Sequence, residues 1–172
     1  MELKTVFESR IIAARVKEMG KEIDRVYGSD PLVGICVLKG AAIFFADLVR
    51  SIANPKLELD FVRIASYGNN DVSSGNILLG KDIETDIKNK HVLIVEDIVD
   101  SGRTMSFLSS HFLAREPLSL RIAALVDKHE RRETGARIDF AGFWRKDGFL
   151  VGYGMDYAEM YRSLPDICEM IP

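Results

Sequence analysis

The sequence predicts an α/β fold in which a mostly parallel central sheet is flanked by helices. Short runs of branched apolar residues recur along the chain, and most of them alternate with segments whose apolar residues repeat at helical spacing. The run at residues 92–95 is apolar throughout, as expected of a parallel strand that is buried on both faces.

The composition is that of an ordinary globular protein. Of the 172 residues, 47% are hydrophobic and 28% are charged, so we expect residues 1–172 to form a single domain. The net charge of −3 disfavours extended contact with nucleic acid. No apolar run approaches the roughly 20 residues of a membrane span, and the charged N-terminal segment does not resemble a signal peptide. We therefore expect a cytoplasmic protein, in which Cys36 and Cys168 are reduced thiols.

Three segments have the apolar spacing of helices. They lie at residues 12–26, 41–52 and 105–112. The first is expected to end near Gly28, because glycine commonly follows the last turn of a helix. Asn54-Pro55 and Pro117 lie beyond the ends of the other two, where proline prevents the helix from continuing.

Seven shorter segments have the composition of strands. They lie at residues 32–38, 57–64, 77–79, 92–95, 120–126, 138–144 and 149–153. In the second, Leu57, Leu59 and Phe61 alternate with polar residues, which predicts a strand with a period of two. Residues 68–75 hold glycine, serine, asparagine and aspartate and almost nothing apolar, which predicts a mobile surface loop between two strands.

Three carboxylates follow the apolar run at 92–95. Glu96 and Asp97 are adjacent, and Asp100 lies three residues further on. Like charges at close range raise one another's pKa, so this grouping is costly unless a cation or a ligand rich in hydroxyls binds there. Polar groups at the carboxyl end of a strand are where open α/β sheets bind ligands. These carboxylates fit the hydroxyls of a ribose, directly or through a metal ion.

A glycine-bearing turn comes directly after the carboxylates. The hydroxyls of Ser101 and Thr104, together with the free N–H groups of the following helix start, are suited to binding an anion. Gly102 allows the backbone to approach a ligand closely. A segment that binds hydroxyls and an anion side by side predicts a sugar phosphate as the ligand.

Residues 92–104 resemble the phosphoribosyl pyrophosphate signature of the type I phosphoribosyltransferases, in a form close to that of the hypoxanthine-guanine enzymes. Four further matches occur in the order of that family, and together the five span about residues 32 to 162. Leu38-Lys39-Gly40 resembles its pyrophosphate loop, Ser66-Tyr67-Gly68 the start of its mobile lid, and Asp127-Lys128 and residues 149–157 its base-binding segments.

The resemblance implies the family's fold and the roles of individual residues. It implies a core at about residues 30–145 and a small hood from about residues 146–172 with part of the N-terminus. Asp100 would be the catalytic residue that handles a proton at N7 of the base, and Glu96, Asp97 and Asp156 would hold Mg²⁺. Phosphoribosyl pyrophosphate would be bound by Leu38, Lys39, Gly40, Ser66, Tyr67, Glu96, Asp97, Asp100, Ser101, Gly102, Arg103, Thr104 and Arg162. A purine would be bound by Lys128, Phe149, Leu150 and Asp156.

The activity implied is purine salvage, in which a phosphoribosyl group is transferred to N9 of hypoxanthine or guanine by a homodimer or homotetramer. Lys128 as a donor to O6 favours a 6-oxopurine over adenine. Alternatives stay open: the base is xanthine or a pyrimidine, or the protein is a regulator that senses phosphoribosyl pyrophosphate and binds nucleic acid through the basic segment 128–137. A purely structural module leaves the carboxylates unexplained.

Overall fold

A computed structural model of the protein describes residues 2–66 and 77–171, with side chains at all of them except residues 65 and 66. The predicted α/β class is confirmed. The main sheet has the strand order β4-β3-β2-β5-β6-β7, and all neighbours are parallel except the antiparallel pair of β3 and β4. Its strands are β2 (Leu32–Leu38), β3 (Leu57–Ser66), β4 (Ile77–Lys81), β5 (His91–Val99), β6 (Ser119–Asp127) and β7 (Phe140–Trp144).

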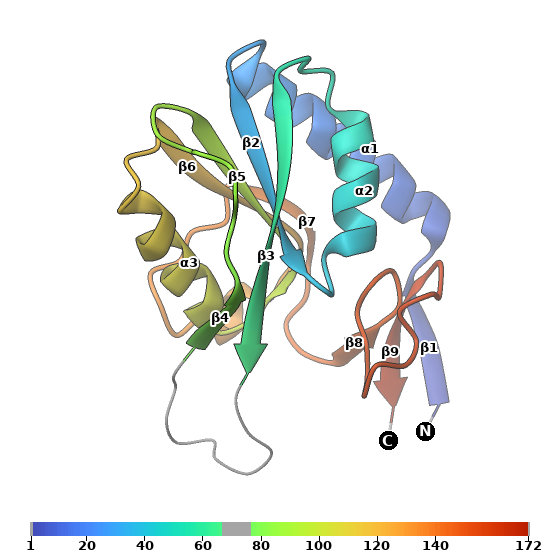
Figure 1. The fold of residues 1–172 in the computed structure, drawn as a ribbon. Coiled ribbons are helices and arrows are strands. Elements are labelled where there is room, and N and C mark those ends of the chain that lie inside the picture. The colour runs from blue at the N-terminus through green and yellow to red at the C-terminus, as the bar shows by residue number, and fades with distance from the viewer. Residues whose placement is uncertain (1, 67–76, 172) are drawn as a thin grey trace.

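Within the described residues, three α-helices cover the two faces of this sheet (Figure 1). The helices α1 (Ser9–Tyr27) and α2 (Ala42–Ser51) lie on one face, and α3 (Arg103–Leu113) lies on the other. Each helix agrees with its predicted segment, although Val26 is exposed and Tyr27 is buried in its place. No helix in the described part of the chain is long and apolar enough to cross a membrane.

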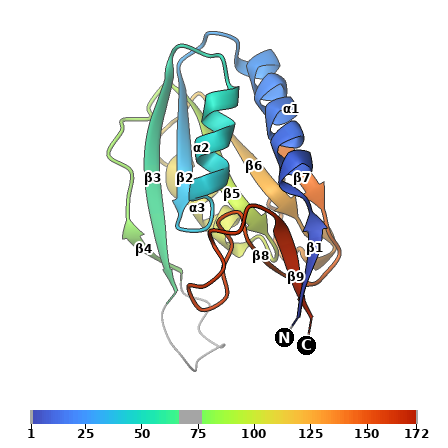
Figure 2. The same ribbon diagram turned by 90° about the vertical axis from the view of Figure 1, so that its right-hand side faces the viewer.

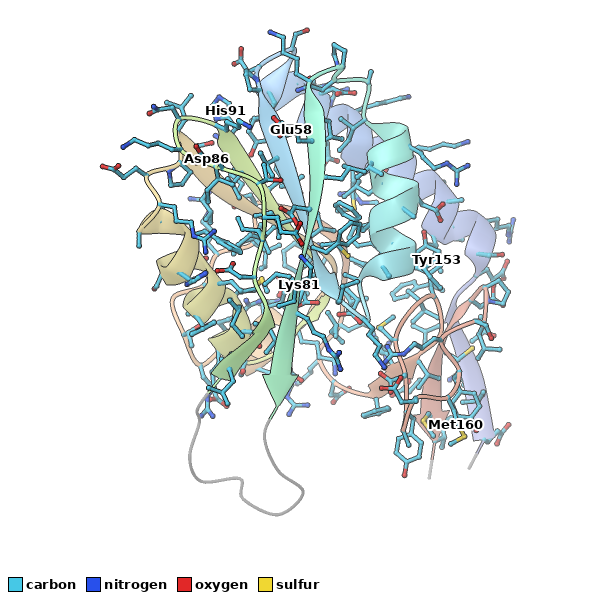
Figure 3. The ribbon with its side chains drawn as sticks, viewed as in Figure 1. Glu58, Lys81, Asp86, His91, Tyr153 and Met160 are labelled. Atoms are coloured by element: carbon cyan, nitrogen blue, oxygen red, sulfur yellow. The ribbon has the colours of Figure 1, made fainter. Side chains whose placement is uncertain are left out.

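A second, three-stranded antiparallel sheet is built from the two ends of the chain. It joins β1 (Glu2–Phe7), β9 (Ile167–Ile171) and β8 (Phe149–Val151) in that order. Figures 1 and 2 show it beyond the carboxyl ends of the parallel strands, next to the lower end of α2. The hydroxyl of Tyr153, labelled in Figure 3, donates a 2.6 Å hydrogen bond to Asp47 of α2 and so ties the small sheet's segment to the main body.

Two hydrophobic clusters lie on opposite faces of the main sheet. One joins α1 and α2 to residues of β2, β5 and β6 and reaches Leu150 and Ile167 of the small sheet. The other joins α3 to the opposite side of the same strands. The strand β5 lies between β2 and β6 in the middle of the sheet and contributes buried residues to both clusters, as its unbroken apolar run predicts.

The face of β3 that is buried is not the face that carries the alternating apolar residues. Leu59 and Phe61 are 47% and 39% exposed, whereas Asp60 and Val62 are buried. The Asp60 carboxylate accepts hydrogen bonds from the backbone N–H groups of Glu84 and Thr85, so the segment after β4 closes over this face of the strand. The strand predicted at residues 57–64 is present, but the alternation of its apolar residues does not identify the buried face.

Leu93 of β5 tests the contribution of the central strand to stability. Its side chain is 1% exposed, and Leu93→Ala should lower the free energy of unfolding by about 2–5 kcal/mol because it leaves a cavity in the core. Urea denaturation would measure this loss. Leu118→Ala, at a leucine that is 63% exposed, is the matched control and should change stability by no more than about 0.5 kcal/mol. Equal losses at the two sites would contradict the central position of Leu93.

Candidate active site

The carboxylates of Glu96 and Asp97 lie within β5, which extends further than the predicted residues 92–95. Both side chains are buried, and the backbone N–H of Asp97 donates to Glu96 Oε1 at 3.2 Å. Burial, followed by the charge of Asp97, raises the pKa of Glu96 well above its usual range, and burial also raises the pKa of Asp97. Burial and the same two carboxylates raise the pKa of the nearby Cys36 thiol to about 12. Acidic groups are therefore gathered at the end of β5, in surroundings that disfavour their ionisation.

Two glycines allow other segments to pack directly against this strand end. A Cβ atom on Gly40 would collide with Oδ2 of Asp97, and a Cβ atom on Gly154, which has a φ of +104°, would collide with the carbonyl oxygen of Gly40. The peptide bond between Leu38 and Lys39 is cis. The loop after β2, the end of β5 and the segment after β8 thus meet at one place.

The turn between β5 and α3 forms a small cavity of about 140 Å³. Gly102 occupies the N-cap position of α3 with a φ of +81°, and it has no side chain with which to cap the helix. The backbone N–H groups at the helix start can therefore bind an anion. The guanidinium of Arg103 contacts Glu133 at 2.6 Å. The cavity is lined by Glu96, Ile98, Val99, Asp100, Ser101, Gly102, Thr104 and Met105.

A larger cavity of about 540 Å³ adjoins the first, because Ile98 and Asp100 line both. Phe149 is 52% exposed there, and its ring meets that of Tyr157 edge to face with centroids 5.7 Å apart. One face of the Phe149 ring is thus available to a flat ligand. The cavity is lined by Asp97, Ile98, Asp100, Lys128, Arg131, Gly148, Phe149, Leu150, Met155 and Asp156.

Lys128 is a buried cation in the larger cavity. Its Nζ donates a 2.7 Å hydrogen bond to the carbonyl oxygen of Gly148 and lies 3.7 Å from Oδ2 of Asp100. Burial lowers the pKa of Lys128, and the negative charge of Asp100 opposes that change. The two side chains present a donor and an acceptor next to each other, which suits a ligand with complementary atoms on one edge.

The cations of Lys39 and Arg162 lie in the same region. Both contact Glu159, with distances of 3.0 Å from Lys39 Nζ and 3.4 Å from a terminal nitrogen of Arg162. Arg162 also contacts Asp156 at 2.7 Å and donates to the carbonyl oxygen of Gly154. No sequence pattern predicts a role for Glu159, because only the fold brings it to Lys39, 120 residues away.

Glu96 and Asp97 are compatible with Mg²⁺ if the substrate supplies further ligands. Within residues 2–66 and 77–171, no group of three or more histidine, cysteine, aspartate or glutamate side chains is arranged to hold a metal. Mg²⁺ is usually bound through one or two carboxylates together with substrate phosphates, which a neighbouring carboxylate pair can satisfy. Asp156 is held by Arg162 in this structure. Ser66 ends β3, and Tyr67 lies outside the described residues.

Comparison with known proteins relates the whole chain to one family. A model described as phosphoribosyl transferase domain matches residues 2–158. The hypoxanthine-guanine phosphoribosyltransferase of Bacillus subtilis is 43% identical over 169 residues, which cover 98% of this chain and 93% of that protein.

Solved structures of phosphoribosyltransferases have the same fold as this chain. A crystal structure of a Bacillus anthracis hypoxanthine-guanine phosphoribosyltransferase with a HEPES molecule in its active site matches with a TM-score of 0.93 and 42% identity, covering 99% of this chain and 100% of that one. A Trypanosoma cruzi hypoxanthine phosphoribosyl transferase, studied for the role of its C-terminal region in oligomeric state and activity, matches with a TM-score of 0.92 and 37% identity, covering 100% of this chain and 94% of that one.

The raised pKa of Glu96 predicts a pH-dependent penalty on folding. Because its pKa in the folded protein lies above the ordinary 4.5, ionisation of Glu96 opposes folding increasingly as the pH rises from about 4.5 towards the folded-state value. Glu96→Gln removes this charge. In EDTA, the variant's free energy of unfolding should exceed that of the wild type by a margin that grows as the pH rises above about 4.5.

Urea titrations at several pH values would measure this margin. Glu116→Gln is the matched control, because Glu116 is 71% exposed and paired with Lys88 on the surface, where an ion pair contributes little. Glu116→Gln should change the free energy of unfolding only slightly at every pH. A margin for Glu96→Gln that narrows as the pH rises would contradict the direction of the pKa change.

Proposed function

The chain belongs to the phosphoribosyltransferase family, and from this membership we propose that it transfers the 5-phosphoribosyl group of phosphoribosyl pyrophosphate to N9 of hypoxanthine or guanine. The products would be the nucleoside monophosphate and pyrophosphate, as in purine salvage. The observation that carries the proposal is the placement of Lys128 and Asp100, 3.7 Å apart, in one cavity with Phe149 and beside the anion-binding turn.

The base would be recognised along one edge. O6 and N7 are neighbours on that edge of a 6-oxopurine, so the ammonium of Lys128 can donate to O6 while the carboxylate of Asp100 accepts the proton carried by N7. The exposed face of Phe149 would stack on the ring, and the Leu150 backbone would contact the base edge. Adenine carries a donor at position 6, so its amino group would face the donor Lys128 and leave both unpaired.

The sugar phosphate would be bound on the other side of Asp100. The turn at residues 101–104, including the backbone of Arg103, would hold the 5′-phosphate through N–H groups and hydroxyls. Lys39, the backbone at Leu38 and Gly40, and Arg162 would bind the pyrophosphate, and Glu96 and Asp97 the ribose hydroxyls. Glu96 and Asp97, with Asp156 as a third candidate ligand, would hold Mg²⁺ together with the substrate, and the bound ion would supply positive charge to offset that of the pyrophosphate. Ser66 and Tyr67 remain candidates from the family resemblance alone.

The reaction requires one bond to form and one to break at the anomeric carbon. N9 of the base would form the new bond to that carbon, and pyrophosphate would leave with the electron pair of the old one. The N7 proton would pass to Asp100, which balances the charge developing on the base. The anomeric carbon acquires oxocarbenium character in this step, so the site must exclude water, and we propose that the small terminal sheet helps to do so as a hood.

Self-association is part of the same proposal. Ile43 of α2 and Leu59 and Phe61 of β3 are each more than a third exposed, and they provide apolar surface that a second copy of the chain can bury. We propose a homodimer or homotetramer on this basis. The cytoplasmic location expected from the sequence accords with an enzyme that acts on small phosphorylated substrates.

An assay with a panel of bases tests the function directly. With Mg²⁺ and phosphoribosyl pyrophosphate, hypoxanthine or guanine should yield the monophosphate, adenine and uracil should yield none, and EDTA should abolish product. Chromatographic separation of nucleotides would measure this. Product from xanthine or a pyrimidine alone would replace the proposed base. Salt-dependent binding to nucleic acid, with no product from any base, would favour a regulator instead.

Asp100→Asn tests the proton-accepting role. The amide is nearly the same size but does not take up the N7 proton, so turnover should fall by about 10²- to 10⁴-fold while the affinity for phosphoribosyl pyrophosphate changes little. Steady-state kinetics and ligand titration would separate the two effects. Asp86→Asn is the matched control, because Figure 3 places Asp86 at the end of the molecule opposite the small sheet. Unchanged turnover of Asp100→Asn would rule out the role.

A further inference from the structure

The larger cavity contains a second cation that the proposed chemistry does not use. Arg131 lines it, and its Nε atom lies 3.0 Å from Oδ1 of Asp100. Lys128 lies on the other oxygen, Oδ2, at 3.7 Å. The carboxylate of Asp100 is therefore contacted at one oxygen by Arg131, while its other oxygen is directed towards the cation proposed to recognise the base.

The backbone around Arg131 brackets Asp100 on both sides. The N–H of Lys128 donates to the carbonyl oxygen of Val99 at 3.0 Å, and the N–H of Glu133 donates to that of Ser101 at 2.9 Å. Between these two hydrogen bonds the chain makes the 3₁₀ turn η1 (His129–Arg131). The turn that carries Arg131 is thus attached to both neighbours of Asp100 in the sequence, and this attachment fixes where the guanidinium can reach.

Contacts of Arg132 and His129, on either side of Arg131 in the sequence, fix the position of this turn. Arg132 is largely buried and pairs with the buried carboxylate of Asp127 at the end of β6. Its side chain packs so closely on Gly102 that a Cβ atom there would collide with it. The ring of His129 packs edge to face on Trp144 at a centroid distance of 5.3 Å. A well-held backbone therefore presents the exposed side chain of Arg131 to Asp100.

We propose that Arg131 is a positioning residue for the proton acceptor Asp100. Its ion pair with Oδ1, at 3.0 Å, sets the rotation of the carboxylate so that Oδ2 faces the place where N7 of the base would lie. The guanidinium suits this role because its donors are rigid and it stays charged throughout the working pH range. The inference rests on the proposed function, since it assigns a purpose to Arg131 only if Asp100 takes the N7 proton.

The test compares Arg131→Gln with the wild type in single-turnover formation of nucleotide from hypoxanthine, because product release often limits steady-state turnover. Removing the guanidinium should slow the single turnover about tenfold, a part of the roughly 10²- to 10⁴-fold that general base catalysis contributes. Arg131→Lys, which keeps the charge, should recover part of the rate. The thermal unfolding midpoint should not change, because the ion pair is solvent-exposed. The KM for phosphoribosyl pyrophosphate should not change either, because Arg131 would act on proton transfer through Asp100.

A second background separates positioning from a general structural effect. In an Asp100→Asn protein, Arg131→Gln should cause no further loss, since the group through which it acts is already absent. Arg137→Gln, at an exposed arginine that lies outside the larger cavity, is the matched control and should leave the rate unchanged. Three outcomes would overturn the role of Arg131 and leave the proposed function intact. They are an unchanged rate for Arg131→Gln in the active enzyme, losses that add in the double variant, and a raised KM for phosphoribosyl pyrophosphate. A wild-type protein that forms no nucleotide would overturn the proposed function and this role together.

Discussion

The burial of two adjacent carboxylates at the end of β5 is the constraint around which the site is organised. Glu96 and Asp97 lose water on folding, which raises the pKa of each and opposes the folded state. The rest of the sheet must supply enough apolar burial to hold them there, and the two hydrophobic clusters on either side of β5 do so. A glycine at position 40 is needed because any side chain would displace the Asp97 carboxylate. The cost of this arrangement makes sense only if a ligand interacts with the pair.

Much of the architecture could be predicted from the sequence because the buried strands and helices have strong patterns. The apolar runs of β2, β5 and β6 and the helical spacing of α1 locate the main sheet and its first helix layer. No local pattern predicts the strands β1 and β9, because β1 is mostly exposed and only Ile167 and Cys168 of β9 are buried. The contacts of Glu159 with Lys39 and of Arg131 with Asp100 join segments whose distance in space no local pattern encodes.

The basic segment at residues 128–137 forms contacts in the fold that its charge pattern in the sequence does not predict. As sequence, it is the part of the chain most suited to nucleic acid. In the structure, Arg131 contacts Asp100 and Arg132 contacts Asp127, while Glu133 from the same segment contacts Arg103. Two arginines of the segment are thus paired with carboxylates at or after the ends of β6 and β5, while Arg137 stays exposed.

The antiparallel pairing of β1 with β9 has a practical consequence. Glu2 lies opposite Ile171, so the backbone comes close to closing on itself at the edge of the small sheet. A short peptide linker would span this gap, and cutting the chain at a distant exposed turn would then generate a circularly permuted protein with the same strand pairings. For the same reason, affinity tags or fusion partners at either end emerge side by side, and a bulky one crowds the edge of the small sheet.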